Sequence, residues 1–238
     1  MKKHPCITPE LQAWIGQQHV FFVASAPLSR QGHVNVSPKG LDCLRILHEH
    51  AVCYMDMTGS GNETSAHIAE NQRRTLMFCA FTGAPRILRL YGKGRVVLRD
   101  TQEFDKLVQT TKLPVLPSAR QIIVCQDIDL VITSCGYAVP KYDFVQHRST
   151  HTAYVEARAE TDPDMVHYQQ EHNLTSLDGI VTPLGVKYGT KEKHAVGKKR
   201  RYILILVSVA VLALAVWGLL YLFYFFGTAM IVLGCLPH

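Results

Sequence analysis

The sequence predicts a mainly β (α+β) fold, a small six-stranded barrel with flanking helices, followed by one C-terminal transmembrane helix. Six segments rich in Val, Ile, Phe and Tyr alternate with turn-forming residues, and helical patterns are few, which is typical of a small barrel. The 37 residues at 202–238 contain no Asp, Glu, Lys or Arg. A chain of 238 residues with this uncharged tail fits one globular domain and an anchor better than two full domains.

The expected elements follow one another from the N-terminus. An amphipathic helix at residues 9–17 opens the chain, and the long turn at 27–32 joins the first two strands into a hairpin. The strands are predicted over residues 19–26, 33–36, 51–57, 75–81, 86–98 and 120–133. Helices are predicted over residues 65–71 and 100–111, with one or two polar helices over 142–173 that break at 162–164, and residues 174–190 have the low periodicity of a linker.

The transmembrane helix is predicted over residues 202–226, within the uncharged tail. Ile, Leu, Val and Ala fill this stretch, and about 20 helical residues cross the ~30 Å hydrocarbon core of a bilayer. Aromatic residues at 221–226 suit the far interface. A buried core helix is the alternative, and a lipid-anchor signal fits less well because residues 1–14 show no apolar segment for secretion.

The net charge of +6 is concentrated beside this span. Seven basic residues and one acidic residue at positions 187–201 account for all of it. A cluster of basic residues at one end of a span predicts positive-inside topology, contact with anionic lipid headgroups and a cytosolic N-terminal domain. We therefore expect the lipid bilayer as a partner and no nucleic acid.

The cysteines agree with a reducing compartment. Seven are scattered without a CxxC pair, an odd number that does not suggest a disulfide framework. In a cytosolic domain, the three glycosylation sequons at Asn35, Asn62 and Asn173 are expected to be unused.

A glycine-rich turn at residues 59–64 leads from the third strand into a short helix. Free backbone N–H groups and a helix dipole would suit a phosphate there, with Ser60, Asn62 and Thr64 as side-chain donors. The alternative is a plain capping box, in which Ser60 and Glu63 satisfy the start of the helix. The candidate counter-charges are basic residues on nearby strands, although a charged strand face is most often simply solvated: Lys39, Arg86 and Arg89.

Five stretches together resemble the FMN-binding split barrels of the pyridoxamine 5′-phosphate oxidase-like family. They are residues 21–28 (FFVASAPL), 32–41 (GHVNVSPKGL), 56–64 (DMTGSGNET), 76–81 with 85–92 (LMFCAF and PRILRLYG), and 133–140 (TSCGYAVP). The last is similar to the signature of an uncharacterised branch of the family. The resemblance covers about residues 10–180, so the predicted division is an FMN-binding domain at 1–180, a basic juxtamembrane linker at 181–201 and the anchor with a short tail at 202–238.

This resemblance implies a six-stranded split barrel that forms a homodimer, with FMN bound in clefts between the subunits. Ser37 and Lys39 would border the flavin and its phosphate, Thr58 would lie beside the ribityl phosphate, and Arg86 would approach from the other subunit. Arg89 and the turn residues Ser60, Asn62 and Thr64 complete the candidate site.

Two departures from the family pattern limit the functional prediction. Glu63-Thr64 stands where well-studied oxidases have a basic pair for the phosphate, and the C-terminal Arg/His segment that holds pyridoxine substrates is missing. The prediction is a membrane-tethered FMN-dependent oxidoreductase with an unidentified small-molecule substrate other than pyridoxamine phosphate. The alternatives are a non-catalytic flavin-binding or flavin-less module attached to a membrane, and a barrel that binds a deazaflavin or haem.

Other residues with reactive side chains give weaker signals. Cys135 and Tyr137 could lie at the cleft, but a lone cysteine is more often a small buried apolar residue. His48 and His50 share a strand face without a third ligand at a recognisable spacing, so no metal is predicted. A G-x-S-x-G hydrolase motif is absent and no catalytic residue can be named.

Overall fold

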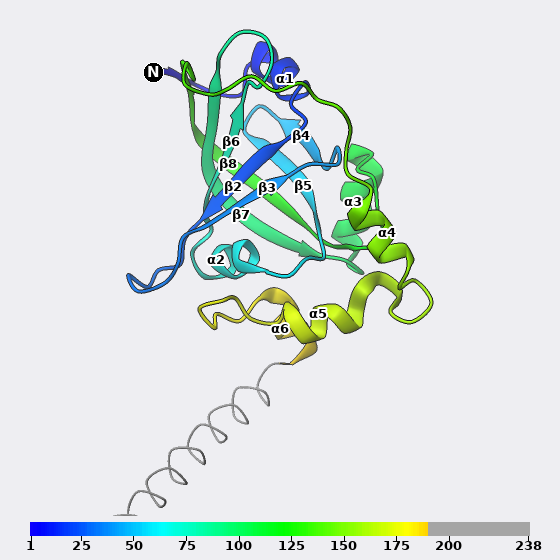
Figure 1. Cartoon of the computed structure of the whole chain (residues 1–238). Helices are drawn as coiled ribbons and strands as arrows, with labels where there is room; N and C mark the ends of the chain where they lie inside the picture. Colours follow the sequence, from blue (N-terminus) through cyan, green and yellow to red (C-terminus); the bar gives the residue numbers. More distant parts are fainter. Residues whose placement is uncertain (190–238) are drawn as a thin grey trace, which may run out of the picture. The chain divides into compact units, whose positions relative to one another are not determined.

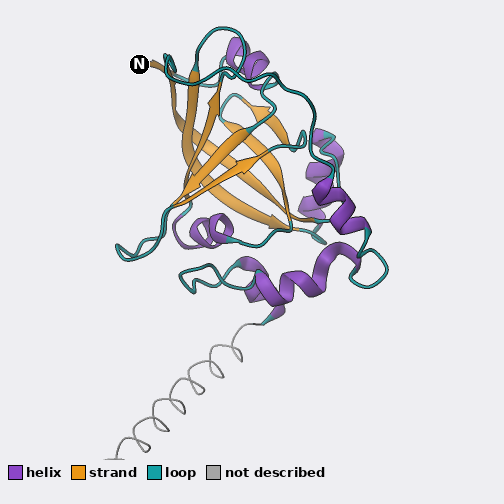
Figure 2. Cartoon of the chain, in the orientation of Figure 1, coloured by secondary structure: helices purple, strands orange, loops and turns teal. Residues whose placement is uncertain are grey.

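The structure is a computed structural model that describes residues 1–189, and its centre is an antiparallel sheet that curls around one core (Figures 1 and 2). The strands are β1 (Lys2–His4), β2 (Phe21–Ser25), β3 (Asn35–Lys39), β4 (Leu44–His48), β5 (Ala51–Met57), β6 (Arg73–Cys79), β7 (Ile87–Leu98) and β8 (Ala119–Ser134). Their order is β3-β2-β6-β7-β8-β5-β4, and β1 pairs with β8.

Six helical segments of α type and one 3-10 turn flank this sheet in the described part of the chain. They are α1 (Pro9–Ile15), α2 (Glu63–Asn71), α3 (Gln102–Thr111), α4 (Thr150–Glu156), the 3-10 turn (Pro163–Met165), α5 (Val166–His172) and α6 (Pro183–Tyr188). Figure 1 shows α1 at one end of the barrel, and α2 with α5 and α6 at the opposite end. The predicted α+β class, an antiparallel sheet with flanking helices, is confirmed.

The expected count of six strands is wrong, because the described residues form eight. Each of the six expected strands is present, and the two additional ones are short. β1 is polar, and Lys2 is the register partner of Thr133 on β8, so only tertiary pairing defines it. β4 lacks the alternation of apolar and polar residues that marks a strand, and its pairing with β5 shifts register between Ile46 and His48.

The core lies inside the curled sheet and is closed by side chains from the helices. All residues of β5 up to Asp56 are buried, which explains the uninterrupted apolar run in its sequence. α1 adds Leu11 and Ile15 to this core, and α3 adds Phe104. Thr8 and Thr101 cap these two helices through hydrogen bonds accepted from Leu11 N and Phe104 N.

The region after β8 differs most from expectation. Residues 135–149 are irregular, so helix begins at α4 rather than at residue 142. The expected break at 162–164 is present, with Asp164 and Met165 at φ of 58° and 59°. Asp162 then accepts hydrogen bonds from His167 N and Tyr168 N and fixes the start of α5.

Residues 174–190 were expected to be a linker, yet their first part is ordered. Thr175 forms an isolated β-bridge with Val181, and Thr182 caps α6 by accepting a hydrogen bond from Gly185 N at 3.1 Å. α6 packs on α2, α5 and β7. Short turns and caps of this kind leave no periodic signal in a sequence.

None of the helices within residues 1–189 is long and apolar enough to cross a membrane. The span predicted at 202–226 lies outside the described residues, as do residues 190–201 of the predicted juxtamembrane linker. The division at residues 180 and 201 stays a prediction.

Candidate functional site

β3 places three polar side chains on one face, toward the start of α2. Asn35, Ser37 and Lys39 are partly buried, while the intervening Val36 and Pro38 are exposed. β3 ends the sheet order, and an edge strand tolerates a proline that cannot donate a ladder hydrogen bond. The outer backbone edge of β3, which pairs with no strand within residues 1–189, is therefore open to a neighbouring element or a ligand.

Asn35 joins two of the predicted site residues. Its Nδ2 donates to Thr64 Oγ1 at 2.9 Å and to Ser37 Oγ at 3.2 Å, and Ser37 Oγ lies 3.3 Å from Asn35 Oδ1. Ser37 and Thr64, 27 residues apart in the chain, are thus brought together at the first turn of α2. Asn35 was missed, although it lies two residues before Ser37 and so on the same strand face.

Lys39 is held by a buried carboxylate. Its Nζ lies 2.8 Å from Oδ1 of Asp56, which is 4% exposed. Oδ2 of Asp56 accepts hydrogen bonds from Arg120 Nε at 2.9 Å and from Gln121 Nε2 at 2.8 Å. Asp56 and Arg120 were missed; a single acid ending an apolar strand, and an arginine at the start of another, were the available signals.

The Asp56 carboxyl group stays ionised in this environment. Burial by itself raises its pKa, but the charges of Arg120 and Lys39, with hydrogen bonds from Lys39 and Gln121, lower the pKa well below its usual range. Two cations therefore share one anion in a nearly closed space. The surplus positive charge lies beside the polar face of β3.

The turn before α2 is already hydrogen-bonded to the C-terminal helices. Thr58 Oγ1 accepts from Gln169 Nε2 at 2.9 Å, and Asn62 Nδ2 donates to Asn173 O at 3.1 Å. Asn173 Nδ2 donates back to Gly59 O at 2.9 Å. The predicted phosphate donors Thr58 and Asn62 are buried in this structure, so α5 and the residues after it brace the turn.

The start of α2 does not form the expected capping box. α2 begins at Glu63 with Asn62 in the capping position, and Asn62 makes no side-chain capping hydrogen bond, while Ser60 lies outside the helix and is exposed. Glu63 instead accepts from Leu177 N at 3.3 Å. Within residues 1–189, the backbone N–H groups of Glu63 and Thr64 have no hydrogen-bond partner, which leaves donors for an anion.

The two arginines of the candidate set lie apart from this cluster. Arg86 Nη2 is 3.0 Å from Glu10 Oε1, and its guanidinium lies 5.5 Å from the Trp14 ring centroid. Arg89 Nη1 donates to Ser134 Oγ at 3.4 Å. The single chain thus groups Ser37, Lys39, Thr58, Ser60, Asn62 and Thr64 around one turn and does not join Arg86 or Arg89 to them.

The remaining reactive residues lie elsewhere. Cys135 and Tyr137 are exposed on the irregular segment after β8. His50 Nδ1 hydrogen-bonds with Ile128 O at 2.9 Å, and His48 accepts from His50 N. In the part of the chain that the structure describes, no three His, Cys, Asp or Glu side chains are grouped as metal ligands.

The fold is an antiparallel barrel in which polar side chains of an edge strand lie beside the start of a helix. Sequence comparison gives the family to which the chain belongs. The model of the pyridoxamine 5′-phosphate oxidase family matches residues 7–124. The pyridoxamine 5′-phosphate oxidase family protein ustO of Aspergillus flavus is 36% identical over 191 residues, which cover 73% of this chain and 74% of that protein. The chain belongs to the pyridoxamine 5′-phosphate oxidase family.

Solved structures show more distant likenesses. HupZ of Group A Streptococcus is 17% identical, covering 54% of this chain and 94% of that one, with a TM-score of 0.43. An FMN-binding protein from Syntrophomonas wolfei is 13% identical over 57% of this chain and 84% of that one, with a TM-score of 0.36. An FAD-binding protein from Mycobacterium smegmatis is 10% identical over 55% and 97%, with a TM-score of 0.37. At these scores the likenesses carry no argument about function.

Proposed function

We propose that this protein is an FMN-dependent oxidoreductase whose substrate is a small molecule other than pyridoxamine phosphate. Family membership supports a flavin, and the observation that carries its placement is the cluster of donors where β3 meets α2. Lys39, Ser37 and Thr64 converge there beside unpartnered N–H groups of α2.

The residues present fit the phosphate of FMN. Lys39 uses one of its three N–H donors on Asp56, which leaves two for a phosphate oxygen. Asp56 fixes the position of the ammonium group, and the N–H groups of Glu63 and Thr64 add donors at the positive end of the helix dipole. FMN, when bound, would supply the electron-transfer chemistry, and these residues would hold and orient it.

Glu63 opposes a dianion at the same place. Its carboxylate lies against Gly61, where a Cβ would be in steric conflict with it, and it receives a hydrogen bond from Leu177 N. A carboxylate at this position replaces the cation pair of well-studied oxidases, so we expect weaker phosphate binding than theirs. A non-catalytic flavin-binding or other cofactor-binding module is the second candidate, and this carboxylate is the observation that favours it.

We further propose that the protein acts as a homodimer with the flavin at the subunit interface. The irregular segment at 136–149 exposes large apolar side chains, including Tyr137 at 81% and Val145 at 88%, which a second copy would cover. In such a dimer Arg86 of one subunit would approach the flavin of the other. Four further residues remain proposed contacts of the cofactor: Arg89, Ser60, Thr58 and Asn62.

The membrane attachment is also a proposal. It rests on the uncharged stretch at 202–226 and on the basic residues that precede it, which together predict a single-pass protein with a cytosolic N-terminal domain. Chemistry beside a bilayer surface would then distinguish this protein from family members without such a span.

The visible spectrum of the full chain, purified in a mild detergent, tests the flavin. A flavin absorption spectrum that NADH or NADPH bleaches under anaerobic conditions supports the oxidoreductase. A flavin spectrum that neither reductant changes favours the binding module. A colourless protein that does not quench the fluorescence of added FMN overturns both flavin readings.

A further inference from the structure

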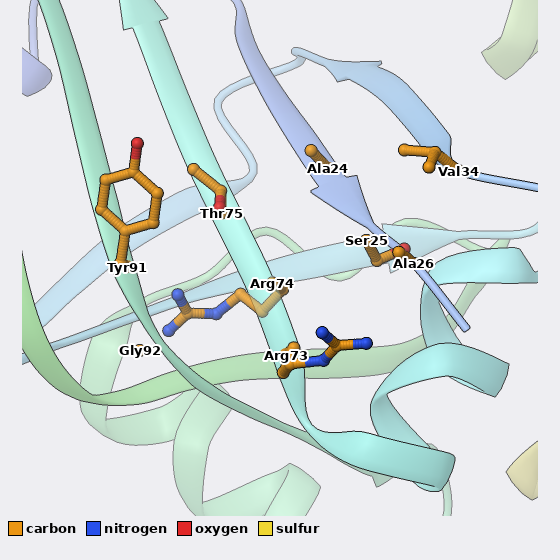
Figure 3. A pocket seen from close by; sticks show the side chains of 9 residues that line it. All are labelled: Ala24, Ser25, Ala26, Val34, Arg73, Arg74, Thr75, Tyr91 and Gly92. Carbon is orange, nitrogen blue, oxygen red and sulfur yellow. The ribbon is translucent and has the colours of Figure 1, made fainter. Parts of the chain in front are cut away.

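A second candidate site lies on the outer face of the sheet, where β2, β6 and β7 run side by side (Figure 3). It is a hollow of about 390 Å³ near the end of β2 and the start of β6, beside the middle of β7, and we refer to it as the β2–β6–β7 pocket. That volume is within the range of small-molecule pockets, roughly 300–1,000 Å³. None of the candidate flavin residues lines it.

The strand register explains why the sheet is hollow here. Ala24 on β2, Thr75 on β6 and Tyr91 on β7 are consecutive cross-strand partners, so their side chains point to the same face. The short side chains of Ala24 and Thr75 leave space in the middle of this row. The Tyr91 ring forms one wall, and Figure 3 shows it next to Thr75.

Two hydroxyl groups in the pocket have unused hydrogen-bonding capacity. Neither Tyr91 Oη nor Thr75 Oγ1 has a hydrogen-bond partner among residues 1–189. Both can donate and accept. Polar groups placed at an apolar hollow in this way are typical of ligand sites.

Arg73 provides a positive charge that is also largely unused within residues 1–189. Its guanidinium makes one hydrogen bond, from Nη2 to Pro27 O at 3.3 Å, and it forms no ion pair in the described chain. Its charged register partner on β7 and the carboxylate of Glu70 on α2 both have other contacts within residues 1–189. Lys93, the register partner of Arg73, lies 3.6 Å from Asp127, and Glu70 accepts from Leu28 N at 2.7 Å.

Arg74 adds positive charge from inside the barrel. It is 4% exposed, its Nη2 donates to Lys93 O at 3.0 Å, and its Nε and Nη1 have no partner in the described part of the chain. Figure 3 shows its guanidinium extending from β6 toward Gly92 on β7, its register partner. Within residues 1–189 no carboxylate pairs with this buried cation, so it raises the positive potential of the pocket.

We propose that the β2–β6–β7 pocket binds a small organic oxyanion, a carboxylate or phosphate monoester with a compact apolar body. Arg73 pairs with the oxyanion, the surface around Ala24 and Gly92 contacts the apolar body, and the hydroxyls of Thr75 and Tyr91 bind its polar substituent. This site is separate from the proposed flavin site and does not rest on it.

Fluorine NMR titration of the full chain in a mild detergent tests the proposal. The probes are 4-fluorobenzoate, 4-fluorophenyl phosphate and, as the neutral control, 4-fluorobenzyl alcohol. We expect at least one anion to bind more tightly than the alcohol, and the better anion identifies the headgroup class. Equal binding of the alcohol and both anions, or no binding by any probe, overturns the proposal.

Variants locate the binding. Arg73→Gln should weaken the anion by about tenfold, as expected for a lost charge-assisted pair, and Tyr91→Phe by roughly 2- to 10-fold while the ring is retained. Arg158→Gln, which removes a partly exposed arginine that stacks on Tyr154, is the charge-matched control. Unchanged binding in Arg73→Gln, or an equal loss in Arg158→Gln, overturns the assignment.

Repeating the titration with saturating FMN tests whether the β2–β6–β7 pocket is distinct from the proposed flavin site. Undiminished probe binding in its presence supports two distinct sites. Competition between FMN and the probe overturns the separate site and leaves the flavin proposal standing.

Discussion

Lys39 Nζ and Asp56 Oδ1 lie 2.8 Å apart, although the two residues come from different strands and Asp56 is almost completely buried. Arg120 holds the second oxygen of the same carboxylate. This arrangement keeps one cation at the edge strand and one inside the barrel. The shared carboxylate therefore links the stability of this end of the barrel to the position of Lys39, which is proposed to bind the phosphate.

Removing the shared anion should destabilise the fold. Asp56→Asn leaves Lys39 and Arg120 without their counter-charge in a buried space, and we expect a loss of about 3–5 kcal/mol in the free energy of unfolding, measured with urea. Asp42→Asn, which breaks the exposed pair with Arg45, is the matched control and should lose about 0–1 kcal/mol. Equal losses in the two variants would show that burial of the cluster has no energetic consequence.

The same carboxylate should make the stability of the fold depend on pH in the acidic range. The pKa of Asp56 is lower in the folded state than its unfolded value of about 3.9, because Arg120 and Lys39 outweigh the effect of burial. Its contribution is therefore complete above pH ~4 and is lost as pH falls from there toward the folded pKa. Urea midpoints at successive pH values should fall more steeply below pH ~4 in the natural chain than in Asp56→Asn. Parallel curves would remove Asp56 from the acid response.

Lys39 should set the affinity for FMN. Lys39→Ala removes a charge-assisted hydrogen bond to the phosphate, so the dissociation constant measured by flavin fluorescence should rise roughly 10- to 150-fold, or about 1.5–3 kcal/mol. Lys93→Ala, which removes an exposed lysine that pairs only loosely with Asp127, should leave the affinity unchanged. An unaltered constant in Lys39→Ala would remove Lys39 from the site.

Glu63 should limit that affinity. Glu63→Gln keeps an acceptor for Leu177 N but removes the negative charge beside the helix start, so FMN should bind about 2- to 5-fold more tightly. Glu103→Gln, a neutralisation in the first turn of α3, is the control for net charge. A matching gain in Glu103→Gln would attribute the effect to overall charge instead of to the site.

Asn173 should keep the turn before α2 in place. Asn173→Ala deletes the donor to Gly59 O and leaves that carbonyl unpaired, which should cost about 1–3 kcal/mol and raise amide hydrogen exchange at residues 58–64. Gln146→Ala, on the exposed irregular segment, should change neither measurement. Native-like exchange in Asn173→Ala would show that the turn holds its shape without this hydrogen bond.

Several elements could be predicted because their signals are local. The apolar run at β5 and the break at 162–164 are patterns of neighbouring residues, and each is where the sequence places it. β1 and β4 gave no such signal, since β1 exists only through pairing with β8 and β4 through pairing with β5. The family resemblance identified the turn before α2 but not Asp56, whose role depends on partners 17 and 64 residues away.

The sequence by itself determined the α+β class, the family and the uncharged C-terminal stretch, because composition, periodicity and motif spacing are properties of the chain. Only the tertiary structure decided which polar groups are free. It places Thr58 and Asn62 in hydrogen bonds with the C-terminal helices, separates Arg86 and Arg89 from Lys39, and forms the pocket beside Arg73. The physical reason is that hydrogen-bond satisfaction and burial are set by contacts between residues distant in the chain, which no local pattern records.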